Sequence, residues 1–418
     1  LARERFGIAP VQPRAGAEFG LFDDKWFFHV SQYTVKIHIS QYVRLHFLNR
    51  FFARAWYNYG TSIEGCTSGE RIKMGLFHSS DIGLDLGTSN VLAYVRGKGI
   101  VLREPNVAAI ERGTGKMVAV GQEAKDMVGR APDNLMIVRP MQDGVVANFD
   151  ATERMLTLFF NRIVGSRIFF KPRAVVAVPS MATEVEKRAV IETTEGAGAR
   201  YTFLLEEPVA AAIGAGLDIL EPKANLVMDI GAGTCDIVVT SMGKAVRHDS
   251  LRVGGDKFDA AIVRYLKRQH GVVIGTRAAE ELKIAYASAL VRKDEIKMDV
   301  RGRSLGGGLP ITLELGSNEL TFALAEPLLS IAEALKDTLE QTPPELAGDI
   351  ATRGICLTGG GAQLFGLAQY ISEQTGVSCY VAEDPVACVA IGCGKVLEEP
   401  QTYEGVLYDY RRGDYYEE

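Results

Sequence analysis

The sequence predicts an α/β protein in which one domain plan is used twice. Two stretches carry this prediction, residues 81–95 (DIGLDLGTSNVLAYV) and residues 225–239 (NLVMDIGAGTCDIVV). Each contains an apolar strand, an Asp, a short loop with Gly and Thr, and a second apolar strand, which is the pattern of a β-hairpin. Both halves then continue with a strand running into a loop (AVVAVPS, GICLTGGGA) and a strand, two acids, Pro and a helix (FLLEEPVAAAIGAG, CYVAEDPVACVAIGCG). We therefore expect two similar domains with a cleft between them.

The other elements of the first half follow from local patterns. We expect strands at residues 91–103, 107–120 and 171–180, and helices at residues 151–164 and 183–199. A turn at residues 113–115 divides the second of these strand regions. Asp150 or Thr152 can cap the first helix. Pro208 suits the first turn of the helix that follows Glu206 and Glu207, because its missing N–H would have no partner there.

The domain limits follow from the duplication. We expect a first half at residues 81–220, on which residues of the far C-terminus pack, and a second half at residues 221–397. Residues 243–339 have no counterpart in the first half and predict an inserted lobe, with a glycine loop at residues 306–308. Residues 398–418 form an acidic, tyrosine-rich tail.

Composition excludes some classes of protein. The chain has 418 residues, 47% of them hydrophobic and 23% charged, and a net charge of -6, so nucleic acid is not expected as a main partner. It contains no run of 18 apolar residues, the minimum for a membrane span. The six cysteines include no CxxC pair, which favours a reduced, cytoplasmic protein.

Residues 1–73 differ in composition from the duplicated region. They are rich in aromatic residues and locally basic, for example in QYVRLHFLNRFFARAWYNYG at residues 41–60. One interpretation is an amphipathic membrane helix, although the stretch has no clean polar face. The interpretation that we favour is upstream sequence that is not part of the native protein. The chain begins with Leu, Met74 lies seven residues before Asp81, and GERIK before it can be encoded by a purine-rich ribosome-binding stretch.

The two hairpin loops have the chemistry of a phosphate site. Glycines at Gly87, Gly231 and Gly233 allow successive N–H groups to converge on an anion, and Thr88, Ser89 and Thr234 add hydroxyl donors. The carboxylates of Asp85 and Asp229 would repel phosphate unless a divalent cation lay between them. The pattern therefore predicts Mg²⁺ and a nucleotide held between the two halves.

Several motifs resemble the MreB-type family of bacterial actin-like cell-shape proteins, within the actin, Hsp70 and sugar-kinase superfamily. They are DLGTSN (85–90), GKGIVLREPNV (97–107), LLEEPVAAAIGAGL (204–217), DIGAGTCD (229–236), RVGGDKFDAAI (252–262), TPPELAGDI (342–350) and LTGGGAQL (357–364). The resemblance implies an actin-like fold, with ATP and Mg²⁺ bound in the cleft. The second loop reads GAGTCD (231–236) where many members of the family read GGGTTE, and Ser89, Gln142 and Asn148 also depart from the usual residues. These departures, Ala232 among them, bear on the rate of hydrolysis.

Roles for individual residues follow. The resemblance places a water-orienting carboxylate at Glu207, with Thr234 near the same water; the adjacent Glu206 is the alternative. The phosphate loops comprise Gly87, Thr88, Ser89, Asn90, Gly231, Ala232, Gly233 and Thr234. The stretch Gly359, Gly360, Gly361 and Ala362 would lie flat against the base or the α-phosphate, or would simply begin a helix. AEELK resembles the family segment beside adenine and ribose, which nominates Glu280 and Lys283; alternatively they form a solvated helix face.

A short loop has the chemistry of a membrane contact. Phe169 and Phe170 follow Ile168 and are flanked by cations at Arg167, Lys171 and Arg173. This combination suits an anionic lipid surface, as the resemblance also implies. The alternative is that both phenylalanines pack under the preceding helix, beside Phe159 and Phe160.

Taken together, the phosphate-site pattern and the resemblance imply a slow Mg-dependent ATPase that polymerises into filaments on the inner face of the cytoplasmic membrane. The resemblance implies that other subunits, the membrane and proteins of cell-wall synthesis and cell shape are its partners. The alternatives are a chaperone-type or a sugar-kinase-type ATPase of the same superfamily. Only about twenty residues follow the last predicted helix, and no pocket for a second substrate stands out.

Overall fold

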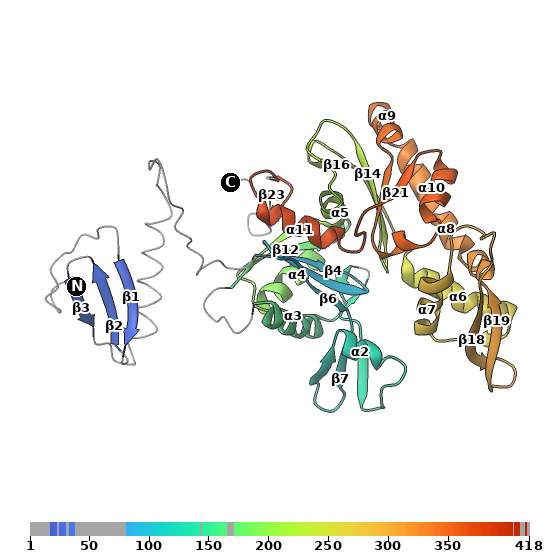
Figure 1. Ribbon diagram of the computed structural model, residues 1–418, viewed down its shortest axis with the longest axis horizontal. Helices are drawn as coiled ribbons and strands as arrows, with labels where there is room; N and C mark the ends of the chain where they lie inside the picture. The colour runs from blue at the N-terminus through green and yellow to red at the C-terminus, as the bar shows by residue number, and fades with distance from the viewer. Residues whose placement is uncertain are drawn as a thin grey trace. The chain divides into compact units, whose positions relative to one another are not determined.

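The computed structural model describes residues 81–142, 144–164, 171–403, 405–409 and 414–415, together with three strands near the N-terminus. The chain divides into two compact units, Leu1–Met74 and Gly75–Glu418. In the first unit, the described strands are β1 (Ala17–Phe22), β2 (Lys25–Val30) and β3 (Tyr33–Ile37), which pair in antiparallel order (Figure 1). The remaining elements all belong to the second unit.

A sheet of seven strands forms the centre of the first half, in the order β23-β22-β13-β12-β4-β5-β6. Its strands are β4 (Ile82–Leu86), β5 (Asn90–Val95), β6 (Gly99–Pro105), β12 (Arg173–Val178), β13 (Tyr201–Glu206), β22 (Tyr408–Asp409) and β23 (Asp414–Tyr415). Strands β4, β5 and β6 are antiparallel neighbours, whereas β12 runs parallel to both β4 and β13. The tail contributes β22, which pairs with β13 through Leu204 and Tyr408.

The second half repeats this order in a five-stranded sheet, β16-β15-β14-β20-β21. Its strands are β14 (Asn225–Ile230), β15 (Cys235–Ser241), β16 (Lys244–Leu251), β20 (Ile355–Thr358) and β21 (Cys379–Val381). Three antiparallel strands are again followed by two parallel ones. The predicted duplicated α/β fold is therefore confirmed. Strand β16 corresponds to β6, so the part of residues 243–339 outside the shared plan begins after it.

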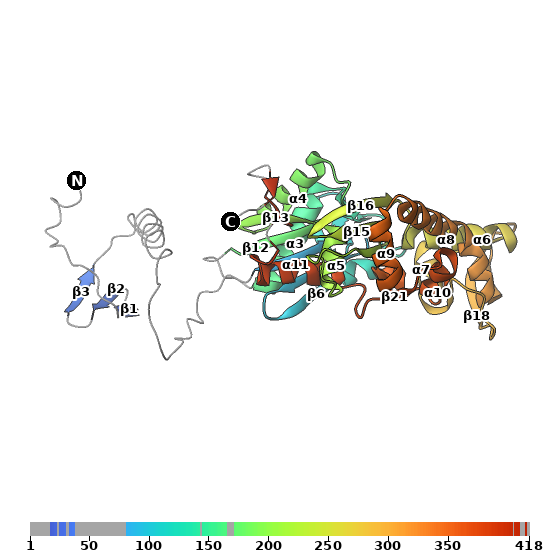
Figure 2. The ribbon, with the colours of Figure 1, turned by 90° about the horizontal axis from the view of Figure 1, so that it is seen from above.

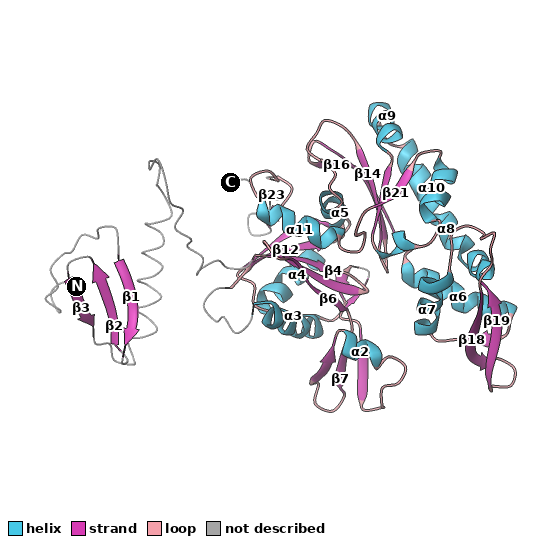
Figure 3. Ribbon diagram, in the orientation of Figure 1, coloured by secondary structure: helices cyan, strands magenta, loops and turns pink. Residues whose placement is uncertain are grey.

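Each half also carries a small lobe (Figure 3). In the first half, a sheet in the order β8-β7-β9 lies beside one short helix, and β10 and β11 form a separate pair. The elements are β7 (Ala108–Glu111), β8 (Met117–Val120), α2 (Gln122–Asp126), β9 (Leu135–Val138), β10 (Met141–Gln142) and β11 (Val145–Val146). The lobe of the second half comprises α6 (Gly255–Gln269), α7 (Thr276–Tyr286), β17 (Val272–Val273), β18 (Lys297–Ser304) and β19 (Pro310–Gly316).

Helices cover the main sheets and bury apolar faces. On the first sheet these are α3 (Phe149–Val164) and α4 (Glu184–Gly196); on the second half they are α8 (Ser317–Glu340), α9 (Pro344–Arg353) and α10 (Leu367–Thr375), preceded by the 3₁₀ turn η1 (Gly360–Gln363). Phe159 and Phe160 of α3 are buried in the core of the first half. The predicted caps of α3 are wrong, because the helix begins earlier and the Asn148 side chain accepts a hydrogen bond from the Ala151 N–H at 3.0 Å.

Two further helices, α5 (Glu207–Gly214) and α11 (Cys388–Glu398), lie side by side between the sheets (Figures 1 and 2). Their side chains share one buried cluster. The crossing is close because both contact points are glycine. A Cβ at Gly214 would lie 1.8 Å from the Cys388 carbonyl oxygen, and one at Gly392 would lie 1.9 Å from that of Ala210. This crossing joins the two halves.

Candidate functional site

A cavity of about 510 Å³ lies between the two halves, a size typical of small-molecule sites. Both glycine-rich turns face it. Of the residues predicted to bind a cofactor or metal or to act in catalysis, those lining the cavity are Asp85, Gly87, Thr88, Ser89, Asn90, Glu207, Asp229, Gly231, Ala232, Gly233, Thr234, Glu280, Lys283, Gly359, Gly360 and Gly361. Ala362 does not line it and is buried in the core of the second half.

The first turn, between β4 and β5, is held by a buried residue that the sequence patterns did not single out. The Asn106 side chain donates to the carbonyl oxygens of Thr88 at 2.9 Å and Met141 at 2.8 Å, and its backbone N–H donates to Ser89 at 2.8 Å. The Thr88 hydroxyl accepts a further hydrogen bond from the Gly144 N–H at 3.0 Å. The turn is therefore fixed by hydrogen bonds from Asn106 and Gly144.

The second turn, between β14 and β15, is held by the start of α6. The N–H groups of Gly255 and Asp256 donate to the carbonyl oxygens of Gly231 and Ala232 at 3.0 and 2.8 Å. Within the turn, the Gly231 N–H donates to the Thr234 carbonyl oxygen at 2.9 Å. Because these carbonyls point to the helix, the turn can present its remaining N–H groups elsewhere, as an anion site requires.

The third glycine stretch is explained partly by packing. Gly359 has a φ of 80°, and a Cβ there would lie 2.4 Å from the Ile230 carbonyl oxygen. A Cβ at Gly361 would lie 2.3 Å from the Ile230 side chain, whereas one at Gly360 would meet open space. Gly359 and Gly361 thus allow the segment to pack against the end of β14, while all three glycines line the cavity.

Acidic side chains meet at the base of the cavity. Burial, and then the charge of Asp229, raises the pKa of Asp85 to about 8. Burial raises the pKa of Asp229 to about 7, with a contribution from Asp236, although a 2.7 Å hydrogen bond from the Thr358 hydroxyl opposes the shift. Burial raises the pKa of Glu207 well above its usual range, and the nearby charges of Asp236, Asp85 and Asp229 raise it further. The site therefore gathers carboxyl groups away from water, where their charged forms are disfavoured.

Glu206 and Glu207 have different surroundings. Glu206 accepts a hydrogen bond from the Ser180 hydroxyl at 3.0 Å and does not line the cavity. Glu207 lines it, and its Oε2 atom is buried without a hydrogen-bond partner. The sequence patterns did not single out Asp236, which pairs with Asp229 across β14 and β15 and is buried near Glu207. Burial raises the pKa of Asp236, although the Ser250 and Thr234 side chains oppose the shift, and neither Asp236 carboxylate oxygen accepts a hydrogen bond of ordinary geometry.

The carboxylates fit a cation held indirectly. Within the described part of the chain, no group of three or more His, Cys, Asp or Glu side chains is placed to bind a metal directly. Mg²⁺ dehydrates reluctantly and is commonly held through its waters and a phosphate. The unpartnered Glu207 oxygen and the crowding of charge around Asp85 and Asp229 are what such a hydrated cation would satisfy.

Glu280 and Lys283 are engaged by the protein itself. The Lys283 ammonium donates to the Gly255 carbonyl oxygen at 2.9 Å and lies 2.8 Å from the Asp259 carboxylate. Glu280 forms a salt bridge of 3.0 Å with Lys125 of the other half. Lys283 therefore ties α7 to the start of α6, and Glu280 connects the two lobes.

The outer wall of the cavity is largely apolar. It comprises Phe258, Ile284, Ala285, Ala287, Leu364, Phe365, Pro385, Val386 and Val389, with Arg292. The Arg292 guanidinium lies 4.0 Å from the centre of the Phe365 ring, which is a cation–π contact. These residues come from separate segments of the chain, so no single motif predicts that they form one wall.

The predicted membrane contact, Phe169 and Phe170, lies outside the described residues. Of its flanking cations, Arg173 makes a bidentate salt bridge with Asp81, with N–O distances of 2.6 and 3.1 Å. Among the described residues, no helix combines the length and the hydrophobicity that crossing a bilayer would require.

Comparison with known proteins matches residues 79–405 to the MreB/Mbl protein family. The chain is 48% identical over 318 residues to the cell shape-determining protein Mbl of Bacillus subtilis (strain 168), which covers 76% of this chain and 96% of that protein. It is 49% identical over 340 residues to the cell shape-determining protein MreB of Escherichia coli (strain K12), covering 80% and 97%. A crystal structure of MreB 5 of Spiroplasma citri bound to AMPPNP superposes with a TM-score of 0.74 at 34% identity, covering 78% and 97%.

Proposed function

The chain belongs to the MreB/Mbl family of actin-like cell shape-determining proteins, and from this we propose that it binds Mg–ATP, hydrolyses it slowly and polymerises into filaments. The observation that carries the proposal is the pair of glycine-rich turns facing one cavity above buried carboxylates. The similar MreB 5 structure, with AMPPNP bound, supports a nucleotide as the ligand. We also propose the domain limits expected from the sequence, with a first half at residues 81–220, a second half at residues 221–397 and a tail at residues 398–418.

The residues divide the chemistry among them. The two turns bind phosphate through backbone N–H groups and the Thr88, Ser89 and Thr234 hydroxyls. Asp85 and Asp229 would hold hydrated Mg²⁺, which supplies neutralisation of phosphate charge when it is bound. Glu207 orients the attacking water, because its Oε2 atom is buried and free of other partners. The apolar wall around Phe258 and Leu364 encloses the remainder of the nucleotide.

The test measures ATP binding with and without Mg²⁺, followed by sedimentation with and without ATP. We expect Mg-dependent binding and ATP-dependent pelleting in the wild type. Asp229→Ala should lose Mg-dependent binding, because it removes one of the two charges that face the cation. Asp229→Asn is the matched variant that keeps the size of the side chain. Wild-type affinity in both variants would refute the metal assignment, and sugar-dependent or peptide-stimulated turnover without pelleting would refute the filament function.

The cellular part of the proposal is wider. We propose that the filaments lie on the inner face of the cytoplasmic membrane, attached through Phe169 and Phe170, and help to organise cell-wall synthesis. Membership of the cell shape-determining family supports this. Depletion of the protein should round the cells in light microscopy; unchanged cell shape would contradict it.

A further inference from the structure

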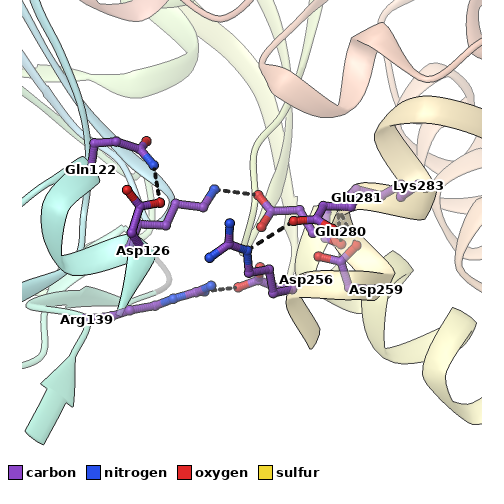
Figure 4. A network of polar contacts seen from close by, with 11 residues as sticks. Gln122, Asp126, Arg139, Asp256, Asp259, Glu280, Glu281 and Lys283 are labelled. Atoms are coloured by element: carbon purple, nitrogen blue, oxygen red, sulfur yellow. Dashed lines mark hydrogen bonds and ion pairs between the residues drawn. The ribbon is translucent and has the colours of Figure 1, made fainter. Parts of the chain in front are cut away.

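Two salt bridges connect the halves beside the cavity, at the lobes (Figure 4). Lys125 of α2 lies 3.0 Å from the Glu280 carboxylate on α7. Arg139, which follows β9, lies 3.0 Å from the Asp256 carboxylate near the start of α6. Each pair therefore joins one element of the first half to one of the second.

Neighbouring polar side chains pair within their own helix. Asp126 accepts a 2.9 Å hydrogen bond from Gln122 on α2, and Glu281 accepts a 3.0 Å bond from Arg277 on α7 (Figure 4). These internal pairs leave Lys125 and Glu280 facing each other across the lobes. The contact between the halves at these helices is therefore the Lys125–Glu280 pair, while the neighbouring polar side chains are occupied within their own helices.

The Arg139–Asp256 pair is tied to the second phosphate turn. The backbone N–H of Asp256 donates to the Ala232 carbonyl oxygen at 2.8 Å, so one residue holds both the turn and the ion pair. The carboxylate itself does not line the cavity.

On the opposite side, the same pair is tied to the first turn. Arg139 lies two residues before Met141, whose carbonyl oxygen and N–H both bond to the Asn106 side chain. Asn106 also holds the Thr88 carbonyl oxygen. A continuous set of contacts therefore runs from one phosphate turn to the other through the Arg139–Asp256 salt bridge.

We propose that the Lys125–Glu280 and Arg139–Asp256 pairs form a clasp that holds the cleft closed over bound nucleotide and sets the rate of nucleotide release. The proposal rests on the proposed nucleotide-binding function. The halves are joined by a buried apolar cluster where α5 and α11 cross, so the lobes are the parts that can separate. Both pairs are partly exposed, with side-chain exposures of 44% and 42% for Arg139 and Asp256, and such pairs are individually weak and reversible.

The experiment reverses the charges of the pair that does not touch the cavity. A fluorescent ATP analogue is bound with Mg²⁺ and its release is followed after excess ATP is added. Arg139→Glu and Asp256→Lys should each speed release by about 3- to 10-fold, since each replaces an attraction by a repulsion. The double variant restores an opposite-charge pair and should return to within about 2-fold of the wild type. Arg139→Gln, which only removes the charge, should give a smaller increase.

Salt and a distant pair provide the controls. Release from the wild type should accelerate with ionic strength, while release from Arg139→Gln should respond less, because the screened contact is already absent. Arg264→Glu breaks an exposed 2.9 Å salt bridge with Glu326, neither of which lines the cavity, and should leave release unchanged. If the wild type binds nucleotide and Arg139→Glu releases it at the wild-type rate, the clasp is overturned while the proposed nucleotide-binding function stands. No binding by the wild type overturns the proposed function together with the clasp.

Discussion

Two adjacent glutamates differ in what they contact, and this difference supports the role that we propose for Glu207. Glu207 lines the cavity with an unpartnered Oε2 atom, whereas Glu206 is occupied by the Ser180 hydroxyl. We expect Glu207→Ala to bind ATP with Mg²⁺ but to hydrolyse it at least about 10-fold more slowly, the lower part of the range for a positioned acid–base group. Phosphate release and binding are measured on the same sample. Glu206→Ala is the matched control; an equal loss of hydrolysis in both variants would make Glu207 structural.

The buried carboxylates also predict how stability depends on pH. The pKa of Asp85 is raised to about 8 and that of Asp229 to about 7, above the values of unfolded carboxylates. The folded protein therefore holds these protons more tightly than the unfolded chain. Without Mg²⁺ or nucleotide, stability should fall as the pH rises from about 4, the pKa of an unfolded Asp, to about 8, the folded pKa of Asp85.

Thermal melting across this pH range measures the effect. Asp229→Asn removes one titrating group, so its melting temperature should fall less steeply with pH than that of the wild type. Saturating Mg–ATP should also flatten the curve, because a cation favours the charged carboxylates. Equal slopes in the wild type and Asp229→Asn would show that Asp229 does not titrate in this range.

At the scale of elements, the crossing of α5 and α11 depends on two glycines. A Cβ at Gly392 would meet the Ala210 carbonyl oxygen at 1.9 Å, and backbone atoms cannot move aside as a side chain can. We expect Gly392→Val to destabilise the protein by at least about 1–3 kcal/mol, the usual cost of overpacking. Gly348→Val in α9 is the comparison, since a Cβ there meets nothing within 4 Å. Urea unfolding of both measures the difference; equal stabilities would contradict the close crossing.

The elements also show what the sequence could predict. Hairpins, buried strands and the strand–acid–acid–Pro–helix order are local patterns, and they predicted the duplicated sheets and the cavity-facing turns. The crossing of α5 and α11 was not predictable, because each glycine matters only for the backbone of a distant segment. Asn106 was missed for the same reason, since its side chain acts by donating hydrogen bonds to the carbonyl oxygens of Thr88 and Met141, which are distant in the sequence. The pairing of Glu280 with Lys125 likewise depends on how the halves meet.

For the whole molecule, the membrane proposal depends on assembly. Inserting the side chains of Phe169 and Phe170 could contribute about 3–6 kcal/mol, at about 1.5–3 kcal/mol each. Basic residues near anionic lipid add about 1 kcal/mol each, and Arg173 is already paired with Asp81. A single subunit should therefore bind weakly and reversibly. A filament presents the same loop on many subunits, so attachment should strengthen with polymerisation.

We therefore expect Phe169→Ser together with Phe170→Ser to release filaments from anionic liposomes while ATP hydrolysis stays intact. Flotation with liposomes measures binding, in a chain that starts at Met74, because the aromatic and basic residues before it could bind lipid themselves. The matched control is Leu305→Ser with Leu309→Ser, which removes two exposed apolar side chains, 56% and 70% accessible, from a different loop. That control should float like the parent chain. If the phenylalanine variant also floats like the parent, the loop packs into the protein and the attachment lies elsewhere.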